Sequence, residues 1–208
     1  MQVMPNSSVE APSNGTDENK ISAVAGNATG NEGVVLLLMR HGQTIDNVNR
    51  IMQGQTQGML TDEGRQQAAA TAQQWTAQPI DVFVASDLRR AIDTCRIMAL
   101  PHFNGDAQMA ERAIVTTPLL RERDWGSFTG RYIPDLKDAV WTDDIETVEA
   151  LLQRAEQFIR WIKHCYAGKT VLTVGHGIIN KAIQSVHYNM PMNQIKPMGN
   201  AEIRTLHL

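Results

Sequence analysis

The stretch VVLLLMRHGQT, residues 34–44, decides the fold. Its apolar residues, 34–39, form a short run typical of a buried strand in a parallel sheet. The run ends in Arg40, His41 and Gly42. In open α/β sheets, ligands bind beyond the carboxyl ends of the strands. A guanidinium can bind an oxyanion, an imidazole can act as base, acid or nucleophile near neutral pH, and glycine permits close approach. Arg40 and His41 are therefore candidates for a functional site; the alternative is that they only cap the strand.

Length and composition indicate a globular chain. It has 208 residues, 42% hydrophobic and 20% charged, which suits one sizeable domain. The net charge of −3 argues against general binding of nucleic acid, although a local positive pocket stays possible. The longest apolar run is too short to span a membrane. Cys95 and Cys165 lie far apart without CxxC spacing, which favours small buried thiols in a reducing compartment, and we expect a cytoplasmic protein.

Residues 1–33 differ in composition from the rest of the chain. They contain no aromatic residue and no arginine, and are rich in Asn, Ser, Gly, Ala and Thr. Such a segment cannot bury enough apolar surface to offset its ordering entropy, so we expect a disordered tail before a single domain at 34–208. It lacks the basic and apolar regions of a standard signal peptide. A functional start near Gly33 is an open alternative.

Further strands and helices are predicted to alternate along residues 34–208. Strands are expected at 80–85, 114–120 and 170–174, with a final edge strand at 202–208. Helices are expected at 61–75, from an N-cap at Ser86 or Asp87 to residue 100, at 147–166 and from 177 to about 188. The helix at 147–166 has an apolar stripe of Val148, Leu151, Leu152, Ala155, Ile159, Ile162 and Tyr166. This alternation predicts an α/β sheet sandwiched between helices.

Polar residues follow four of the predicted strands. The segments are RHG (40–42), SDLRR (86–90), LRERDWG (120–126) and GHG (175–177). Because the carboxyl ends of parallel strands share one edge of a sheet, we expect these segments to meet there. The resulting inventory is two imidazoles, at least two guanidinia, one carboxyl and amides: His41, His176, Arg40, Arg90, Glu122, Asn47 and Gln53.

This inventory suits a phosphoryl group. Guanidinia bind phosphate oxygens and stabilise the charge that develops on them during transfer. A neutral imidazole can attack phosphorus, and a carboxyl group such as that of Glu122 can protonate the leaving oxygen. The histidines lack close metal-ligand spacing, and no GxSxG motif supports a serine nucleophile. Arg89 and Arg90 begin a predicted helix, where a bound anion would relieve their conflict with the helix dipole; we expect Arg89 to face solvent and Arg90 to face the anion.

The four segments resemble the motifs of the histidine phosphatase superfamily, the phosphoglycerate mutase-like group. The resemblance runs in order through residues 34–208, from LMRHGQT (38–44) through SDLRRA (86–91) and LRERDWG (120–126) to GHG. It implies a three-layer α/β sandwich with a mostly parallel central sheet flanked by helices. It implies no metal and no organic cofactor.

The resemblance also implies residue roles. His41 would take the phosphoryl group as phosphohistidine, and Glu122 would be the proton donor. Phosphate and substrate would be bound by Arg40, Asn47, Gln53, Gly54, Arg90 and His176. We expect the non-attacking nitrogen of His41 to donate to a backbone carbonyl, which would fix its tautomer.

The segment after the glutamate motif separates two activities. Mutases resembling the glycolytic enzyme carry a longer, basic insertion there, whereas residues 129–146 are short and acidic. We therefore predict hydrolysis of a small-molecule phosphomonoester. The alternatives are a phosphoglycerate mutase-type phosphotransferase and, in another class, a non-catalytic protein that binds a phosphorylated ligand. The physiological substrate and the oligomeric state are left open by the sequence.

Overall fold

A computed structural model describes residues 33–208, so the predicted disordered tail lies outside the described residues except for Gly33. Five strands form one sheet: β1 (Val35–Arg40), β2 (Val82–Ser86), β3 (Ile114–Thr117), β4 (Thr170–Gly175) and β5 (Ile203–His207). The helices are α1 (Ile45–Asn49), α2 (Asp62–Trp75), α3 (Arg89–Ala99), α4 (Ala107–Arg112), α5 (Val148–Cys165) and α6 (Gly177–Tyr188).

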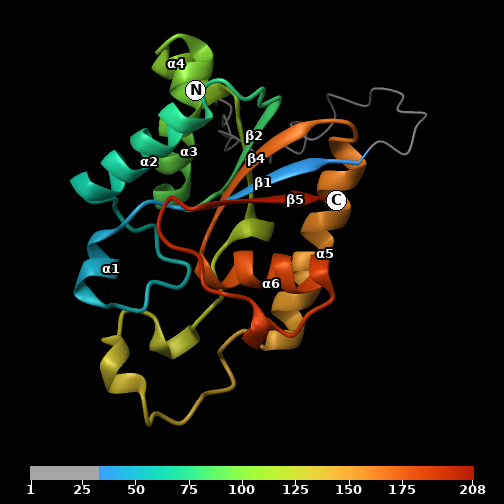
Figure 1. Cartoon of the computed structure of the whole chain (residues 1–208). Coiled ribbons are helices and arrows are strands. Elements are labelled where there is room, and N and C mark those ends of the chain that lie inside the picture. The colour runs from blue at the N-terminus through green and yellow to red at the C-terminus, as the bar shows by residue number, and fades with distance from the viewer. Residues whose placement is uncertain (1–32) are drawn as a thin grey trace, which may run out of the picture.

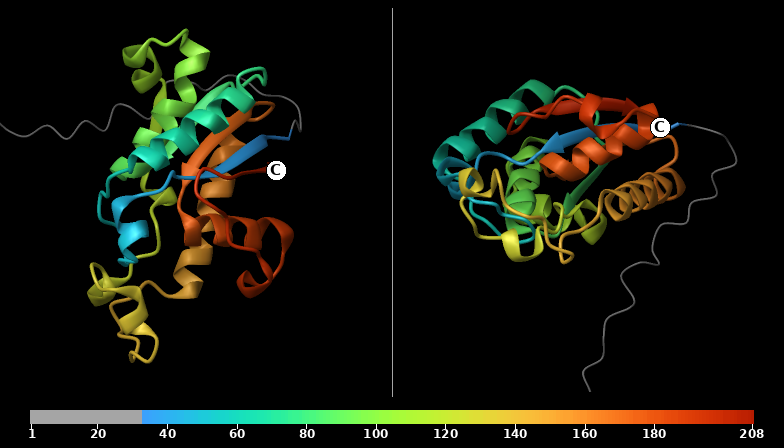
Figure 2. Two further views of the ribbon diagram at one scale, coloured as in Figure 1. Left: turned by 60° about the vertical axis from the view of Figure 1, so that its left-hand side comes forward. Right: turned by 90° about the horizontal axis from the view of Figure 1, so that it is seen from below.

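The sheet has the order β3-β2-β4-β1-β5. The first four strands in that order are parallel to their neighbours, and β5 pairs antiparallel with β1 at one edge. Helices cover both faces, as Figures 1 and 2 show, with α2 and α3 on one side and α5 and α6 on the other. The predicted three-layer sandwich and the predicted edge strand are confirmed.

Strand β1 shows why the opening stretch decides the fold. Leu36 and Leu38 pack into the core beneath α5 and α6, whereas Leu37 and Met39 pack into the core beneath α2 and α3. All four side chains are at most 2% exposed. Since each buried side chain of this size stabilises the fold by roughly 1.5–3 kcal/mol relative to exposure, one strand ties both helical layers to the sheet.

The chain between β1 and α2 contains a short helix, which was not predicted from the sequence. Helix α1 begins after Thr44, whose hydroxyl accepts a hydrogen bond from the Asn47 amide at 3.1 Å. The Asn47 side chain in turn accepts from the Thr44 amide at 3.2 Å. This reciprocal cap uses Asn where Glu or Gln is usual, and the five-residue helix has no buried apolar face, so periodicity gave no signal.

The predicted start of α3 is wrong. Its N-cap is Leu88, without a capping side chain. The first amides of the helix are instead capped by Gln57 from the loop between α1 and α2: Oε1 accepts from Arg89 N at 2.9 Å and the backbone carbonyl accepts from Arg90 N at 3.2 Å. No anion is needed at this helix end, because Gln57 satisfies those donors.

The other predicted elements need smaller corrections. The third strand ends at Thr117 rather than at residue 120, because Pro118 has no amide to continue the ladder and opens a 3-10 turn. On α5, Phe158 is fully buried and belongs to the core stripe that was expected to use Ile159, while Val148 at the first turn is 41% exposed. Helix α4, which was not among the predicted helices, lies between α3 and β3.

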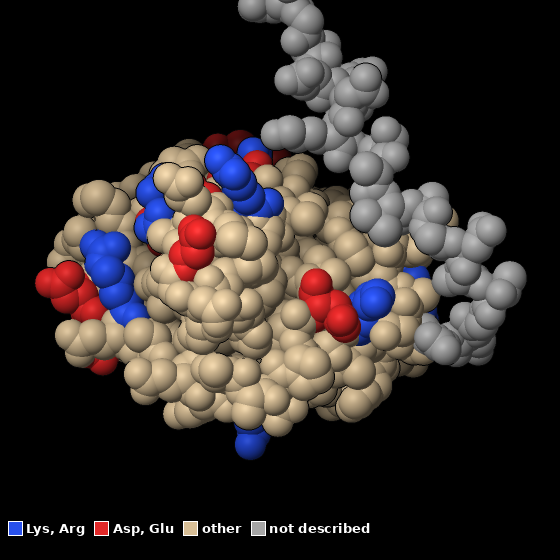
Figure 3. Space-filling view, turned by 90° about the horizontal axis from the view of Figure 1, so that it is seen from above, with Lys and Arg blue, Asp and Glu red and all other residues tan. Residues whose placement is uncertain are grey.

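The described residues include no membrane-spanning helix, and the face in Figure 3 shows no feature of a nucleic-acid-binding protein. Among residues 33–208, no helix combines the length and apolar character needed to cross a bilayer. The face in Figure 3 carries scattered side chains of both charge signs. That face therefore shows no continuous basic patch of the kind that nucleic acid requires.

Candidate active site

His41 lies directly after β1 and is 3% exposed. Its amide donates to the carbonyl of Gly175 at 3.1 Å, which ties it to the end of β4. Its Nδ1 lies 2.7 Å from the carbonyl oxygen of Gly42. Since a carbonyl only accepts, Nδ1 carries the proton and Nε2 presents a lone pair. The expected bond to a backbone carbonyl is therefore present, and it leaves the lone pair of Nε2 free of the Gly42 carbonyl.

The turn after His41 requires glycine for a steric reason. A Cβ on Gly42 would stand 2.4 Å from the carbonyl oxygen of Gly64, in the first turn of α2. The Gly42 amide donates to the hydroxyl of Thr94 on α3 at 3.1 Å. The turn is thus held against both helices of this face, and it fixes the carbonyl that orients His41.

His176 lies at the start of α6 and is fully buried. Its ring centroid is 5.1 Å from that of His41. Arg90 Nε donates to its Nδ1 at 3.1 Å, so the proton of the neutral ring is on Nε2. This Nε2 is buried and has no hydrogen-bond partner in the described part of the chain.

Burial keeps both imidazoles neutral. Desolvation, reinforced by the charge of Arg90, holds the pKa of His41 well below its ordinary value. The same two causes hold the pKa of His176 well below its ordinary value. At neutral pH both rings are thus neutral, with the proton of His41 on Nδ1 and that of His176 on Nε2.

Two arginines provide the positive charge of the site. Arg90 is 1% exposed and donates from Nη2 to the Gly54 carbonyl at 2.9 Å and from Nη1 to the Thr56 carbonyl. Burial lowers its pKa to about 10, so it stays charged at neutral pH. Arg40 donates from Nη1 to the Met198 carbonyl at 2.7 Å, and burial lowers its pKa as well.

Unpaired donors mark the place of a ligand. Arg40 Nε and the Nε2 of His176 are both buried, and neither has a partner among residues 33–208. Buried polar atoms are nearly always hydrogen-bonded, and leaving a donor unpaired costs about 1–3 kcal/mol, more for a charged group. An anion with several acceptor oxygens, such as a phosphoryl group, would satisfy both.

Glu122 approaches this pocket from the segment after β3. Its Oε1 accepts from the amides of Arg123 at 2.8 Å, Ile178 at 3.1 Å and Ile179 at 3.3 Å. Within residues 33–208, its Oε2 accepts from Ile178 alone, at 3.2 Å. A Cβ built on Gly177 would lie 3.7 Å from both Glu122 Oε2 and Arg40 Nε. Oε1 is thus the anchored oxygen, and Oε2 borders the space beside Arg40.

The remaining predicted residues lie around the same pocket. Asn200 Nδ2 donates to the carbonyl of His41 at 3.1 Å and to Asn47 Oδ1 at 3.3 Å, so Asn47 stands beside the His41 backbone. Gln53 is buried, and Nε2 of its side-chain amide donates to the Thr44 hydroxyl. Gly54 has a φ of +52° and offers its carbonyl to Arg90, so its contact is with an arginine of the site.

Sequence reasoning missed the residues that support this site. Asn200 binds the carbonyl of His41, and Thr94 binds the amide of Gly42 in the following turn. Gln57 caps the start of α3. They come from a loop before β5, from the middle of α3 and from the loop after α1, where no local pattern sets a polar side chain apart. Arg89 is half exposed, as expected, and pairs with Asp93 at 3.0 Å.

A cavity of about 400 Å³ lies away from the residues of this site. It is lined by Val35, Leu37, Gln74, Trp75, Gln78, Pro79, Thr170 and Thr205. None of these side chains is charged, and the lining includes the first residues of β1 and β4 rather than their carboxyl ends. Within residues 33–208, no group of three His, Cys, Asp or Glu side chains is arranged to hold a metal ion.

Comparison with known proteins assigns this geometry to a family. Residues 36–208 match the family model described as "Histidine phosphatase superfamily (branch 1)". A probable phosphoglycerate mutase GpmB of Enterobacter sp. (strain 638) is 31% identical over 168 residues, which are 74% of this chain and 74% of that protein. An acid phosphatase of Mycobacterium tuberculosis is 28% identical over 167 residues, which are 76% of this chain and 77% of that protein.

A solved structure shares the fold. The protein described as "Mycobacterial hydrolase 1" superposes with a TM-score of 0.73 at 24% identity, covering 84% of this chain and 92% of that one. At this identity the likeness concerns the fold alone.

Proposed function

The chain belongs to the histidine phosphatase superfamily, and from that premise we propose that it hydrolyses phosphomonoesters through a phosphohistidine on His41. The observation that carries the proposal is the pairing of a buried, neutral His41 with two unpaired donors beside it, on Arg40 and His176. A nucleophile and an anion site in one pocket are what phosphoryl transfer to an enzyme requires.

In the first step, His41 Nε2 attacks phosphorus as the bond from phosphorus to the ester oxygen breaks. The proton on Nδ1 remains shared with the Gly42 carbonyl. The leaving oxygen takes its proton from Glu122, and we assign that proton to Oε2, because Oε1 is engaged by three backbone amides.

In the second step, Glu122 acts as a base. Its carboxylate takes a proton from a water molecule as the water oxygen attacks phosphorus and the bond to His41 Nε2 breaks. The products are inorganic phosphate and the free enzyme, with Glu122 protonated for the next cycle. The amides of Ile178 and Ile179 stabilise the carboxylate between the two steps.

The phosphoryl oxygens carry the developing charge, and donors preorganised around them lower the barrier. We assign this role to Arg40, Arg90 and His176, with Asn47 assisting. Gln53 and Gly54 act by supporting the site: the carbonyl of Gly54 holds the Arg90 guanidinium in place, and the Gln53 side chain binds the Thr44 hydroxyl.

The segment 129–146 supports hydrolysis over mutase activity. Its cations are Arg131, which stacks on Phe128 with 5.3 Å to the ring centroid, and Lys137. Asp144 accepts from the Ser127 amide, and Glu146 pairs with Arg154 at 2.7 Å. Asp135, Asp138 and Asp143 form no ion pair within residues 33–208, so the segment carries an excess of negative charge, which disfavours a second acidic group on the substrate.

A mutase is the second candidate, because one 31% identical relative is named a probable phosphoglycerate mutase. A panel of sugar phosphates, nucleotides, phosphoserine and phosphoglycerates decides between them. We expect release of inorganic phosphate by the wild type and none by His41→Ala. Interconversion of phosphoglycerates faster than any hydrolysis would favour the mutase. Binding of phosphorylated ligands without phosphoenzyme or phosphate release would favour a non-catalytic protein.

We also propose a cytoplasmic location. The support is that Cys95 and Cys165 are both free, one buried and the other exposed. Burial raises the pKa of the Cys95 thiol beyond its usual range, which makes it an inert apolar side chain. Fractionation of the cells that express the protein, followed by immunodetection, tests the location.

A further inference from the structure

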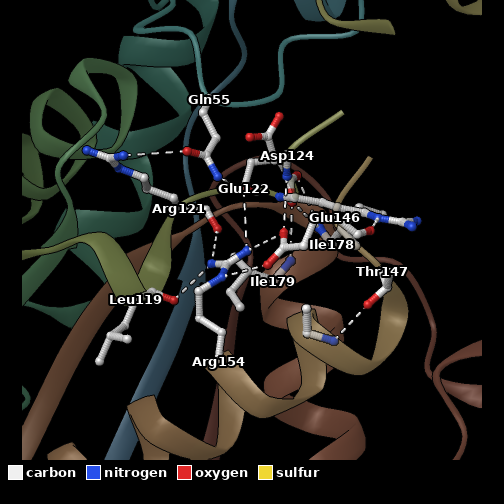
Figure 4. Close-up of polar contacts among 12 residues, drawn as sticks. Gln55, Leu119, Arg121, Glu122, Asp124, Glu146, Thr147, Arg154, Ile178 and Ile179 are labelled. Atoms are coloured by element: carbon white, nitrogen blue, oxygen red, sulfur yellow. Dashed lines mark hydrogen bonds and ion pairs between the residues drawn. The ribbon is translucent and has the colours of Figure 1, made fainter. Parts of the chain in front are cut away.

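Arg154 lies on α5, outside the pocket, and directs its guanidinium at the segment that carries Glu122 (Figure 4). Its Nη1 donates to the carbonyls of Leu119 at 3.1 Å and Arg121 at 2.6 Å. Its Nη2 lies 3.5 Å from the carbonyl of Glu122 itself. One side chain thus binds three carbonyls within four consecutive residues.

The backbone of residues 118–122, which carries Glu122, needs the hydrogen bonds from Arg154 because it belongs to no strand. Strand β3 ends at Thr117, a 3-10 turn occupies Pro118–Leu120, and Glu122 follows two residues later. No ladder of backbone bonds fixes its path, so its carbonyls are free to accept from Arg154. The position of the Glu122 backbone therefore depends on a side chain contributed by another element.

Glu146 extends the support to the other side of Glu122. Its carboxylate forms a two-pronged pair with Arg154, with 2.9 Å from Nε to Oε1 and 2.7 Å from Nη2 to Oε2. The same carboxylate accepts from the amide of Asp124 at 3.1 Å, and the Glu146 carbonyl accepts from Arg123 Nε at 2.7 Å. Residues on both sides of Glu122 are thus fixed to one ion pair.

The pair itself has a small predicted effect on stability. Arg154 and Glu146 side chains are 16% and 13% exposed, and at such burial the desolvation of two charges offsets much of their attraction. The main effect of the pair is to orient the Arg154 guanidinium. A planar guanidinium that a carboxylate holds on one side presents its other N–H donors at fixed angles. Those donors meet the carbonyls around Glu122.

We propose that Arg154 is a positioning residue for the proton transfer of Glu122, an inference that rests on the proposed phosphatase activity. Arg154 fixes the backbone of Glu122, and the amides of Ile178 and Ile179 fix its carboxylate. Together they set where Oε2 stands when the ester bond breaks. The proton then moves from Oε2 to the leaving oxygen as the bond between His41 Nε2 and phosphorus forms.

The test varies the leaving group. An alkyl phosphate has a basic leaving oxygen that needs the proton, whereas p-nitrophenyl phosphate releases a weakly basic phenolate that does not. For Arg154→Met, we expect kcat/KM for the alkyl phosphate to fall about 100-fold, near the lower end of what positioned acid catalysis contributes. The value for p-nitrophenyl phosphate should fall less than about 5-fold. Arg154→Lys should recover part of the alkyl phosphate activity.

Arg160 on the same helix supplies the matched control. Its side chain is 68% exposed and pairs with Glu156 one helical turn away, so Arg160→Met removes a paired arginine from α5 without touching the segment. We expect this variant to hydrolyse both substrates as the wild type does.

Equal losses on the two substrates would overturn the proposal, because they would indicate a general disturbance of the fold. Unchanged activity on both would overturn it too. If Arg154→Met does not fold, Glu146→Gln provides the test through the same substrate pair, with the same selective loss expected and an equal loss contradicting it. Failure of the proposed function is distinguishable, because the wild type would then hydrolyse neither substrate.

Discussion

Replacing Gly177 with alanine should separate activity from stability. Gly177 is the first residue of α6, and its φ lies outside the left-handed region. The added methyl group meets no atom closer than 3.7 Å, so the folded chain accommodates it. Gly→Ala substitutions at compatible positions stabilise proteins by about 0.4–1 kcal/mol through the unfolded state. We expect the free energy of unfolding to be unchanged or to rise within that range.

Activity should fall, because the methyl group would enter the substrate pocket. Its two nearest site atoms are Arg40 Nε, an unpaired donor, and Glu122 Oε2, the proposed proton donor, both at 3.7 Å. A phosphoryl group held between them would be crowded. Overpacking by one methyl group costs about 1–3 kcal/mol. Applied to the transition state, this corresponds to a loss of about 5-fold to 150-fold in kcat/KM.

Urea unfolding and steady-state kinetics on the same preparation measure both effects. Gly199→Ala is the control, because its added methyl would touch only Glu202 Oε2, at 3.6 Å, and we expect its activity to match the wild type. Full activity in Gly177→Ala would refute the placement of the phosphoryl group beside Arg40 Nε and Glu122 Oε2. A variant that is both inactive and strongly destabilised would refute the steric reasoning.

Two other predictions concern the charges of the site. Arg40→Met removes a charged donor to the anion, worth about 1.5–3 kcal/mol, so the inhibition constant of inorganic phosphate should rise about 10-fold to 150-fold; an unchanged constant would exclude Arg40 from the phosphate site. Stability should fall as the pH drops below about 6.5, because the unfolded state protonates its histidines there while His41 and His176, whose pKa values are lowered in the fold, stay neutral. Each contributes a slope of up to about 1.4 kcal/mol per pH unit, and urea unfolding at pH 7.5 and 5.5 should show a smaller difference for His41→Gln than for the wild type. Equal differences would contradict the buried neutral state of His41.

The central part of the fold was predictable because its signals are local. Strand β1 is a continuous apolar run since both of its faces are buried. Helix α2 was expected at 61–75 and spans Asp62–Trp75, with Thr61 as its N-cap, whose hydroxyl accepts from the Gly64 amide. The convergence of RHG and GHG followed from topology, since β1 and β4 pair in parallel with Arg40 opposite Gly175.

What escaped prediction depends on contacts between distant segments. The cap of α3 comes from Gln57, which lies some thirty positions earlier in the chain, so no residue near Leu88 signals it. Arg154 precedes the buried Ala155 on α5 and looks like any charge at the border of an apolar face. Its role depends on the fold, because the turn that begins at Pro118 places three backbone carbonyls next to the Arg154 guanidinium.

The measurement that tests the account most directly is the identity of the phosphorylated residue. The protein would be mixed with a hydrolysed phosphomonoester, quenched within milliseconds in alkali to preserve phosphohistidine, and mapped by mass spectrometry. The account predicts phosphate on Nε2 of His41, because Nδ1 is engaged by the Gly42 carbonyl. Turnover without a phosphoenzyme, or phosphate on Nδ1 or on another residue, would contradict it.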